Sequence, residues 1–288
     1  MLTGSVGMRR VGRERCPDLL ATIVAATQRA VSERMEVCQP RMLELTAAER
    51  CPRAEEFREA LTCADRYNVM AECKRRSPSR GILRSDYCLE TIARGYVAGG
   101  AVALSVLTEP AFFDGKLVHL TQVRAAVDVP LLQKDFFVSK YQLLEARAAG
   151  ADAVLLIVAA LTDHELRGLL FEASRQGLAA LVEVHDAVEL TRALEAGATM
   201  VGINNRNLRT LEVDLTTSRT LIAQIPDTVV TVVESGLKGA ADLVSLRKDG
   251  YDSFLIGESL MTRDDPGKAL LELLADVIAT GCGPRASG

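Results

Sequence analysis

The feature that most constrains this chain is a regular alternation between short aliphatic runs and helical stretches. Each run is rich in β-branched or other aliphatic residues, and the stretch after it carries apolar residues three and four positions apart. The first run begins at residue 68 and the eighth at residue 253, so the repeat is about 26 residues, enough for one strand and one helix. The runs are 68–74, 102–107, 130–134, 153–158, 180–184, 200–204, 229–234 and 253–256.

This alternation predicts an α/β fold, a (β/α)8 barrel. Eight parallel strands, each followed by a helix, within about 250 residues are typical of that architecture. Three of the helical stretches end at glycine, at Gly150, Gly197 and Gly250, as helices returning to a strand often do. A doubly wound sheet is the alternative. It usually has fewer strands, and its dinucleotide-binding form would show a GxGxxG motif after the first run, where this sequence has none.

Two amphipathic stretches precede the first strand, at 17–34 and 55–62. In a barrel such additional helices plug one end or flank the active face, so we expect one domain over 17–280 that includes them. Residues 1–16 are basic at first, with four Arg and one Glu before residue 16, but no apolar signal region follows. We expect a disordered tail there and a second tail at 281–288.

Composition excludes several classes of protein. The chain has 288 residues, a net charge of −4 and no Trp, and no basic stripe is interleaved with aromatics, so a nucleic-acid partner is not expected. The longest apolar runs, such as 153–161, are too short to span a bilayer. The seven cysteines include no CxxC pair, which argues against a disulfide framework or a zinc site and favours reduced thiols in the cytoplasm.

Charged residues stand where the predicted strands end. The first run leads into AECKRRSPSRG, in which Glu72 and Lys74 are two residues apart and therefore face the same way, while Ala71 and Cys73 face the helices. Barrel enzymes carry their chemistry at the carboxyl ends of the strands. The polar residues at those ends would converge on one mouth; they are Glu72, Lys74, Ser105, Lys134, Glu183, Asn204, Glu234 and Ser235.

Each of these residues also has a simpler interpretation. Lys134 could form an ion pair with its neighbour Asp135, and Asn204 could cap a turn. His185 begins a helix and could be a cap-region residue, whereas His119 and His164 lie in helical stretches and are expected to be exposed. No His-carboxylate cluster suggests a metal, so we expect no metal site.

Two glycine-bearing turns follow the last two runs, ESG at 234–236 and IGES at 256–259. The loops after strands seven and eight often bind phosphate in this fold, because backbone N–H groups at a helix N-terminus supply the donors. Gly236 and Gly257 would let the backbone approach the anion closely. Glu258 is an acid beside an anion site, so we expect its side chain to point away.

Long blocks of the sequence resemble one family, indole-3-glycerol-phosphate synthase of tryptophan biosynthesis. The resemblance covers roughly residues 19–273, and its most specific blocks are AECKRRSPSRG, LSVLTEPAFFDG, LLQKDFFVSKYQLLEARAAGADAVLLI, LVEVHDAVELTRALEAGATMVGINNRNLRTLEVDL, VVESGL and FLIGESLM. It implies a carboxy-lyase that converts 1-(o-carboxyphenylamino)-1-deoxyribulose 5-phosphate to indole-3-glycerol phosphate, CO2 and water. No cofactor or metal is implied.

The resemblance also implies a role for particular residues. Lys134 is similar to the general acid of ring closure, Glu72 and Glu183 to the carboxylates that handle protons and the developing iminium charge, and Lys74 to a substrate contact and acid in dehydration. Asn204 resembles the residue that orients the substrate hydroxyls and the carboxylates. The substrate- and phosphate-binding positions would be Ser77, Arg206, Glu234, Ser235, Gly236, Gly257 and Glu258.

The residues themselves agree with this chemistry. Attack on a ketone needs a proton donor for the forming alkoxide, and we expect neighbouring cations to lower the pKa of Lys134 toward that task. One departure from the family pattern is Lys116, where Ser is common, at a position expected to cap a helix.

Two other functions remain open from the sequence. A phosphate-binding barrel lyase or aldolase could use Lys134 as a Schiff base, and a barrel could bind a phosphosugar without turnover. The expected partner is a small phosphosugar-anthranilate substrate, with no nucleic acid and no membrane. We expect a monomer or weak homo-oligomer that could associate with another enzyme of the pathway.

Overall fold

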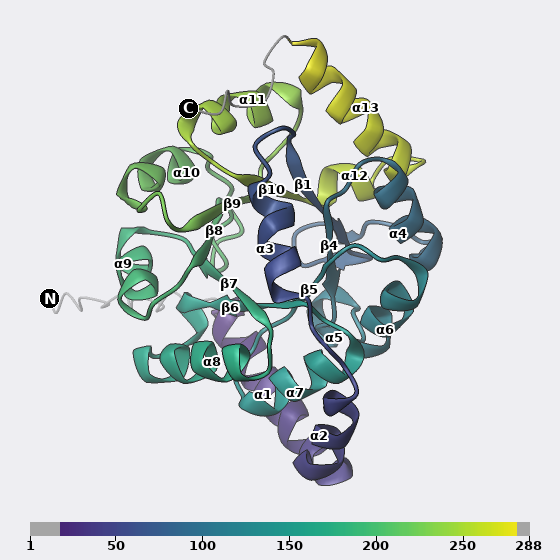
Figure 1. The fold of residues 1–288 in the computed structure, drawn as a ribbon, viewed down its shortest axis with the longest axis vertical. Coiled ribbons are helices and arrows are strands. Elements are labelled where there is room, and N and C mark those ends of the chain that lie inside the picture. Colours follow the sequence, from purple (N-terminus) through teal and green to yellow (C-terminus); the bar gives the residue numbers. More distant parts are fainter. Residues whose placement is uncertain (1–17, 281–288) are drawn as a thin grey trace, which may run out of the picture.

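Eight parallel strands close into a barrel in the computed structural model, which describes residues 18–280 (Figure 1). The predicted tails lie outside the described residues. The hydrogen-bonded order is β1-β10-β9-β8-β7-β6-β5-β4, which confirms the predicted (β/α)8 fold, and each predicted run matches one strand to within one residue at either end. The strands are β1 (Asn68–Cys73), β4 (Ala103–Leu107), β5 (Leu131–Lys134), β6 (Ala153–Ile157), β7 (Ala179–Val184), β8 (Met200–Asn204), β9 (Val230–Glu234) and β10 (Ser253–Ile256).

Helices that follow the strands form a ring around the barrel (Figure 1). They are α4 (Leu89–Ala98), α6 (Leu117–Ala126), α7 (Lys140–Ala149), α8 (Asp163–Arg175), α9 (Ala187–Glu195), α10 (Thr216–Leu221), α11 (Ala240–Asp249) and α13 (Pro266–Ala279). Loops at the barrel mouth carry α5 (Pro110–Phe113), η1 (Val158–Ala160), α12 (Glu258–Met261) and a hairpin of β2 (Arg76–Ser77) with β3 (Gly81–Ile82), and η2 (Ile222–Gln224) continues α10.

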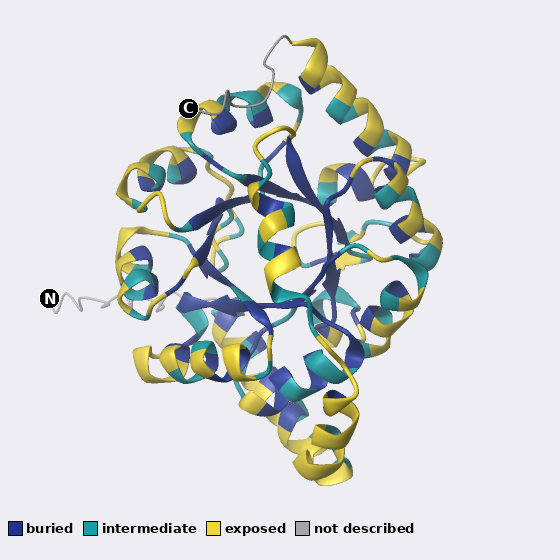
Figure 2. Ribbon diagram, viewed as in Figure 1, coloured by how far each residue is buried: buried dark blue, intermediate teal, exposed yellow. Residues whose placement is uncertain are grey.

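Side chains along each strand alternate between two hydrophobic clusters. On β1, Val69, Ala71 and Cys73 pack outward against the helices, whereas Met70 packs into the barrel interior. Figure 2 shows the consequence: the barrel strands are almost entirely buried, and each surrounding helix is buried mainly along the side that faces them. The expected orientation of β1 is therefore confirmed, and Glu72 belongs to the inner face.

The helices before β1 pack against the two ends of the barrel interior. From α3 (Ala54–Thr62), Phe57 and Leu61 pack against the interior residues, and α3 lies across the ring of strands in Figure 1. From α1 (Leu19–Val37), Leu20 and Ile23 join the same interior cluster from the opposite end. Both predicted roles are confirmed, a plug at one end and a helix beside the other. The sequence interpretation missed α2 (Pro40–Ala48), which packs on α7.

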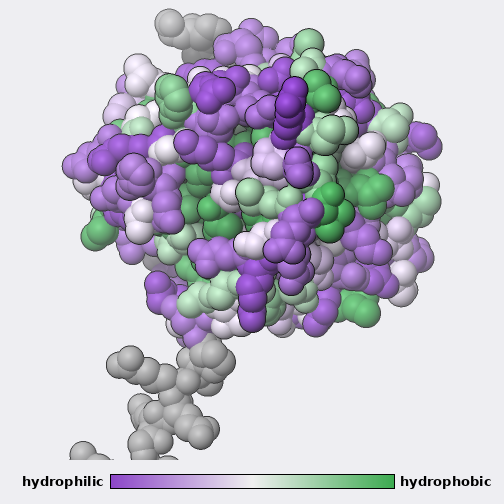
Figure 3. Space-filling model, turned by 90° about the horizontal axis from the view of Figure 1, so that it is seen from below, coloured by the Kyte–Doolittle hydropathy of each residue, from purple (hydrophilic) through white to green (hydrophobic). Residues whose placement is uncertain are grey.

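The surface around α2 is mostly hydrophilic. Figure 3 views the molecule from the end where α2 lies in Figure 1, and hydrophobic side chains gather there only in several smaller patches. From residue 18 to residue 280, no helix is both long enough and apolar enough to cross a lipid bilayer.

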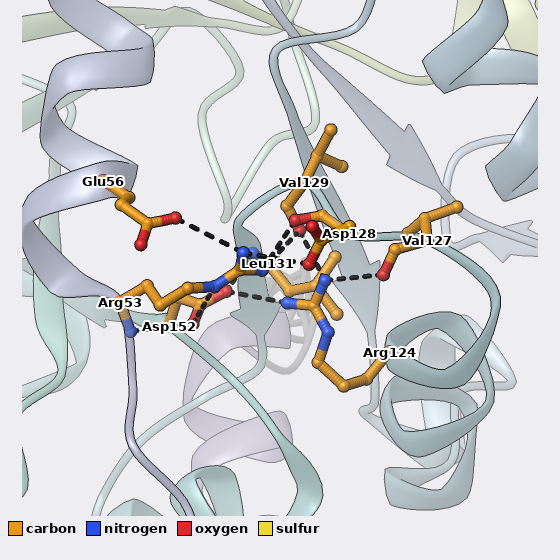
Figure 4. Close-up of polar contacts among 8 residues, drawn as sticks. All are labelled: Arg53, Glu56, Arg124, Val127, Asp128, Val129, Leu131 and Asp152. Atoms are coloured by element: carbon orange, nitrogen blue, oxygen red, sulfur yellow. Dashed lines mark hydrogen bonds and ion pairs between the residues drawn. The ribbon is translucent and has the colours of Figure 1, made fainter.

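Asp152 organises the polar cluster at the amino end of the barrel (Figure 4). One carboxylate oxygen accepts the Arg53 backbone N–H at 2.9 Å, and the other accepts the Leu131 N–H at 2.8 Å and the Arg124 guanidinium at 3.0 Å. Arg124 and Arg53 also donate to main-chain carbonyls of the loop between α6 and β5. One buried carboxylate thus joins the segment before α3 to two strands and to α6.

Replacing Asp152 by Ala tests this cluster. Asp152 is 3 % exposed, and loss of its carboxylate leaves two backbone N–H groups without their acceptor and Arg124 without its acidic partner. Removing one partner of a buried ion pair costs about 3–5 kcal/mol, so the free energy of unfolding in urea should fall by that amount. Asp128→Ala is the matched control, because Asp128 pairs with the same Arg53 from a fully exposed position and should change stability little. Equal stability of the two variants would contradict this account.

Candidate active site

A cavity of about 490 Å³ opens at the carboxyl ends of the strands. All twelve residues expected from the sequence to be catalytic or to bind substrate line it, although they come from positions up to 186 residues apart (72 to 258). The cavity also receives Leu20 and Ile23 from α1, so this helix forms part of its wall. The twelve are Glu72, Lys74, Ser77, Lys134, Glu183, Asn204, Arg206, Glu234, Ser235, Gly236, Gly257 and Glu258.

Lys134 occupies the centre of the charged groups. Its ammonium nitrogen lies 3.1 Å from Glu183 Oε2 and 3.1 Å from Glu234 Oε2, and both acids are buried at the ends of β7 and β9. The simpler interpretation, an ion pair with Asp135, is wrong. The Asp135 carboxylate instead accepts hydrogen bonds from the Thr108 hydroxyl and from the Phe136 N–H.

The charges around Lys134 set its proton affinity. Burial lowers the pKa of Lys134, but the carboxylates of Glu183, Glu234 and Glu72 together raise it well above its usual value. The expectation that neighbouring cations lower this pKa is therefore wrong, because the ammonium group faces acids rather than Lys74. Lys134 is protonated at neutral pH.

The two carboxylates beside Lys134 differ from each other. Burial raises the pKa of Glu183, but Lys134 and then His185 lower it, and its net pKa is below the usual value. Burial also raises the pKa of Glu234, and repulsion from Glu183 adds to it, so that Lys134 does not bring the pKa back down to its usual value. Proximity thus separates two like acids into one that is ionised and one that takes a proton more readily.

A second ion pair lies next to this group. Lys74 Nζ is 2.5 Å from Glu72 Oε1, which confirms that the side chains of Glu72 in β1 and of Lys74 just after it face the same way. Two glycines make room for the acids: a Cβ on Gly257 would lie 2.9 Å from Glu72 Cβ, and a Cβ on Gly202 would overlap the Glu234 carboxylate. The glycine after β10 therefore has a second role that the sequence did not reveal.

Asn204 contacts a carboxylate of the cavity and also caps a turn. Its amide nitrogen donates to Glu183 Oε1 at 3.1 Å, and its carbonyl oxygen accepts the Arg206 backbone N–H at 3.0 Å. The residue therefore holds a carboxylate of the cavity and shapes the turn that follows β8.

The glycine-bearing turns after β9 and β10 form the other side of the cavity. Ser235 and Gly236 both adopt left-handed backbone, with φ of 62° and 84°. The expectation that the Glu258 side chain points away from the cavity is wrong. Its carboxylate lies 2.8 Å from Arg80 Nε and 3.4 Å from an Arg206 nitrogen. Two guanidinium groups attract the carboxylate toward the cavity. Ser77, in the hairpin that carries Arg80, accepts the Arg80 backbone N–H at 3.3 Å.

Sequence reasoning missed an apolar side of the cavity. Phe113 and Phe136 stand with ring centroids 6.3 Å apart, and Leu155, Leu208 and other aliphatic side chains complete the surface. The paired aromatics of LTEPAFFDG, just after the second barrel strand, were the available signal. It also missed that His185 contacts Glu183 and Glu189. The expectation that Ser105 also reaches the mouth is wrong, because this residue is fully buried and does not line the cavity.

Over the described part of the chain, no three or more His, Cys, Asp or Glu side chains are grouped so that they could hold a metal ion. That no cofactor takes part stays a prediction.

Acids and ammonium groups from β1, β5, β7 and β9 around one cavity define an acid–base enzyme of the (β/α)8 class. The family model described as indole-3-glycerol phosphate synthase matches residues 20–273. The chain belongs to this family of carboxy-lyases, as the resemblance predicted.

Curated relatives support the same assignment. An indole-3-glycerol phosphate synthase of Sulfurimonas denitrificans is 50% identical over 74% of this chain and 81% of its own length. Its counterpart from Parafrankia sp. is 49% identical over 82% of this chain and 87% of its own length. That of Koribacter versatilis is 43% identical over 88% of this chain and 98% of its own length. Among solved structures, 3-hexulose-6-phosphate synthase from Salmonella typhimurium shares the fold, with a TM-score of 0.60 and 11% identity over 74% of this chain and 99% of its own.

Adding a methyl group at Gly257 tests the packing of the acid pair. The new Cβ would lie 2.5 Å from Glu72 Oε1, so Glu72 and its partner Lys74 must move. Overpacking costs about 1–3 kcal/mol, so Gly257→Ala should lower both kcat and the melting temperature. Gly239→Ala is the matched control, because nothing lies within 4 Å of a Cβ built there. Unchanged kcat in Gly257→Ala would show that the position of Glu72 is not critical.

Proposed function

We propose that this cavity carries out ring closure, decarboxylation and dehydration of 1-(o-carboxyphenylamino)-1-deoxyribulose 5-phosphate, with Lys134 as the general acid. The observation that carries the proposal is the contact of the Lys134 ammonium with two buried carboxylates at 3.1 Å. Such a group is protonated before substrate arrives. A forming alkoxide is a stronger base than a lysine amine, so proton transfer to it is favourable even from an ammonium of raised pKa.

The two sides of the cavity suit the two ends of this substrate. Ser235, Gly236, Gly257 and Glu258 would receive the phosphate through backbone N–H groups, with Ser77 and Arg206 beside them. The apolar side with Phe113 and Phe136 would receive the aromatic ring. The reacting ketone then lies between them, above Lys134.

In the first step the ring carbon that bears the carboxylate attacks the ketone. The new carbon–carbon bond forms as the carbonyl oxygen takes a proton from Lys134, and the ring nitrogen becomes an iminium. Glu183 and Glu72 stabilise that positive charge electrostatically. The carbon–carboxylate bond then breaks, CO2 leaves, and its electron pair neutralises the iminium.

Dehydration completes the indole. Glu183 accepts a proton from carbon, and Lys74 protonates the departing hydroxyl, which leaves as water. Asn204 would keep Glu183 in position through its hydrogen bond at 3.1 Å, and Glu234 would contact the substrate hydroxyls. The acid and the base of this step stand on different strands, so they can reach opposite sides of the new ring.

We further propose that residues 17–280 act as one catalytic domain in the cytoplasm, as a monomer or weak homo-oligomer that can associate with a neighbouring pathway enzyme. Native mass spectrometry and size exclusion would test the oligomeric state.

Lys134→Met tests the general acid. General acid catalysis is worth roughly 10² to 10⁴ in rate, so kcat, followed by indole fluorescence, should fall by about that factor. Affinity for a reduced, unreactive substrate analogue should weaken much less, because the phosphate side lies on β9 and β10. Lys140→Met is the control, since Lys140 is exposed on α7.

The Lys134→Met change is also expected to affect stability. Without Lys134 the acids Glu183 and Glu234 are buried close together with no cation between them, so the single variant should also be less stable. The double variant Lys134→Met/Glu234→Gln removes one of the two charges and should recover stability without recovering kcat. If kcat of either variant stays within a few-fold of wild type, the acid must be Lys74.

A further inference from the structure

His185 stands directly behind the Glu183 carboxylate. Glu183 Oε2 lies 3.1 Å from Lys134 Nζ, while Oε1 lies 3.3 Å from His185 Nε2 and 3.1 Å from the Asn204 amide nitrogen. The imidazole follows the end of β7 by one residue, and its side chain is 11% exposed. Glu183 is therefore held between a cation in front and an imidazole behind.

Glu189 fixes the other side of the imidazole. Its Oε2 lies 3.0 Å from His185 Nδ1 and also accepts the His185 backbone N–H at 2.8 Å. Glu189 can fold back in this way because Asp186 caps α9 by accepting the Glu189 N–H at 2.8 Å, which places Glu189 in the first turn. The chain thus positions both ring nitrogens of His185 against a carboxylate.

The imidazole does not reach the substrate cavity. Glu183 lines that cavity and His185 does not, so any effect of His185 on the reaction must act through Glu183. A simple capping role would need only the backbone N–H of His185. It would not explain why Nε2 faces an acid of the cavity.

The charges around His185 favour its doubly protonated form. Burial lowers the pKa of His185, but contacts with Glu183 of β7 and Glu189 of α9 raise it to about 10. Lys134 of β5 lies on the other side of the Glu183 carboxylate, and Asn204 of β8 is neutral. At neutral pH both ring nitrogens therefore carry protons, Nδ1 at hydrogen-bond distance from Glu189 and Nε2 as an ion-pair contact of Glu183.

We propose that His185, held by Glu189, is a positioning residue that keeps the Glu183 carboxylate ionised and aimed at the reacting substrate. This inference rests on the proposed catalytic role of Glu183. His185 acts as a fixed positive charge rather than as a proton donor in the reaction.

A readout independent of activity comes first. The chain has three histidines, His119, His164 and His185, so ¹⁵N NMR of the imidazoles can be assigned with single His→Gln variants. His185 should remain doubly protonated at pH 8, and Glu189→Gln should lower its titration midpoint by at least one pH unit. Titration of wild-type His185 near pH 6.5, the value of an unperturbed imidazole, would overturn the proposal.

The pH dependence of kcat/KM tests the catalytic consequence. His185→Gln keeps a donor near Glu183 but removes the positive charge, so the pKa of Glu183 should rise and the acidic limb should move to higher pH. A shift of one pH unit means a tenfold loss of kcat/KM below that limb, with partial recovery above it. The KM for substrate should change little, because His185 does not line the cavity.

Two further variants separate the possible failures. His119→Gln is the matched control: His119 is half-buried on α6 beside Tyr87, away from the cavity, and its loss should leave the pH profile unchanged. If His185→Gln lowers the melting temperature but keeps the wild-type pH profile, the residue is only structural and the inference is wrong. If Glu183→Gln retains kcat, the proposed role of Glu183 fails instead, whatever the state of His185.

Discussion

One largely enclosed ammonium group, that of Lys134, sets the conditions for the rest of the cavity. Lys134 lies 3.1 Å from each of two buried acids, and removing this ammonium group leaves both acids uncompensated at a cost of several kcal/mol. The three residues come from β5, β7 and β9, which are not adjacent in the barrel. Their side chains can meet only if the barrel closes. The fold and the charge arrangement at its mouth therefore depend on each other.

The two ends of the barrel divide stability from chemistry. At the amino end, Asp152 satisfies two backbone N–H groups and Arg124, so its charge is fully used within the protein. At the carboxyl end, Glu183 and Glu234 repel one another and face a cavity. Such a repulsive arrangement persists because the packed interior and the cluster at the opposite end hold the strands in place.

The strands and most of the polar positions that line the cavity were predictable because both follow from local periodicity. Alternation along β1 fixes where Glu72 and Lys74 point, whatever the rest of the chain does. The partners were not predictable, because whether Lys134 meets Asp135 or Glu183 depends on contacts between strands far apart in sequence. The direction of the Lys134 pKa shift was predicted wrongly for the same reason, because the acids that raise it come from other strands. Helix α2 escaped notice because only Ala47 of its residues is buried, so it has little apolar periodicity.

The strength of the contacts changes from the floor of the cavity to its rim. The acids at the floor are buried and Lys134 is only 14% exposed, so their ion pairs are screened less by water than surface pairs are. At the rim, Glu258 pairs with Arg80, whose side chain is 64% exposed, and such pairs are worth about 0–1 kcal/mol. Rim contacts can therefore be exchanged for those of an incoming anion at little cost, whereas floor contacts keep their geometry. A site that must admit a flexible phosphosugar and then hold one reacting carbon in place needs both properties, and the burial gradient of this barrel supplies them.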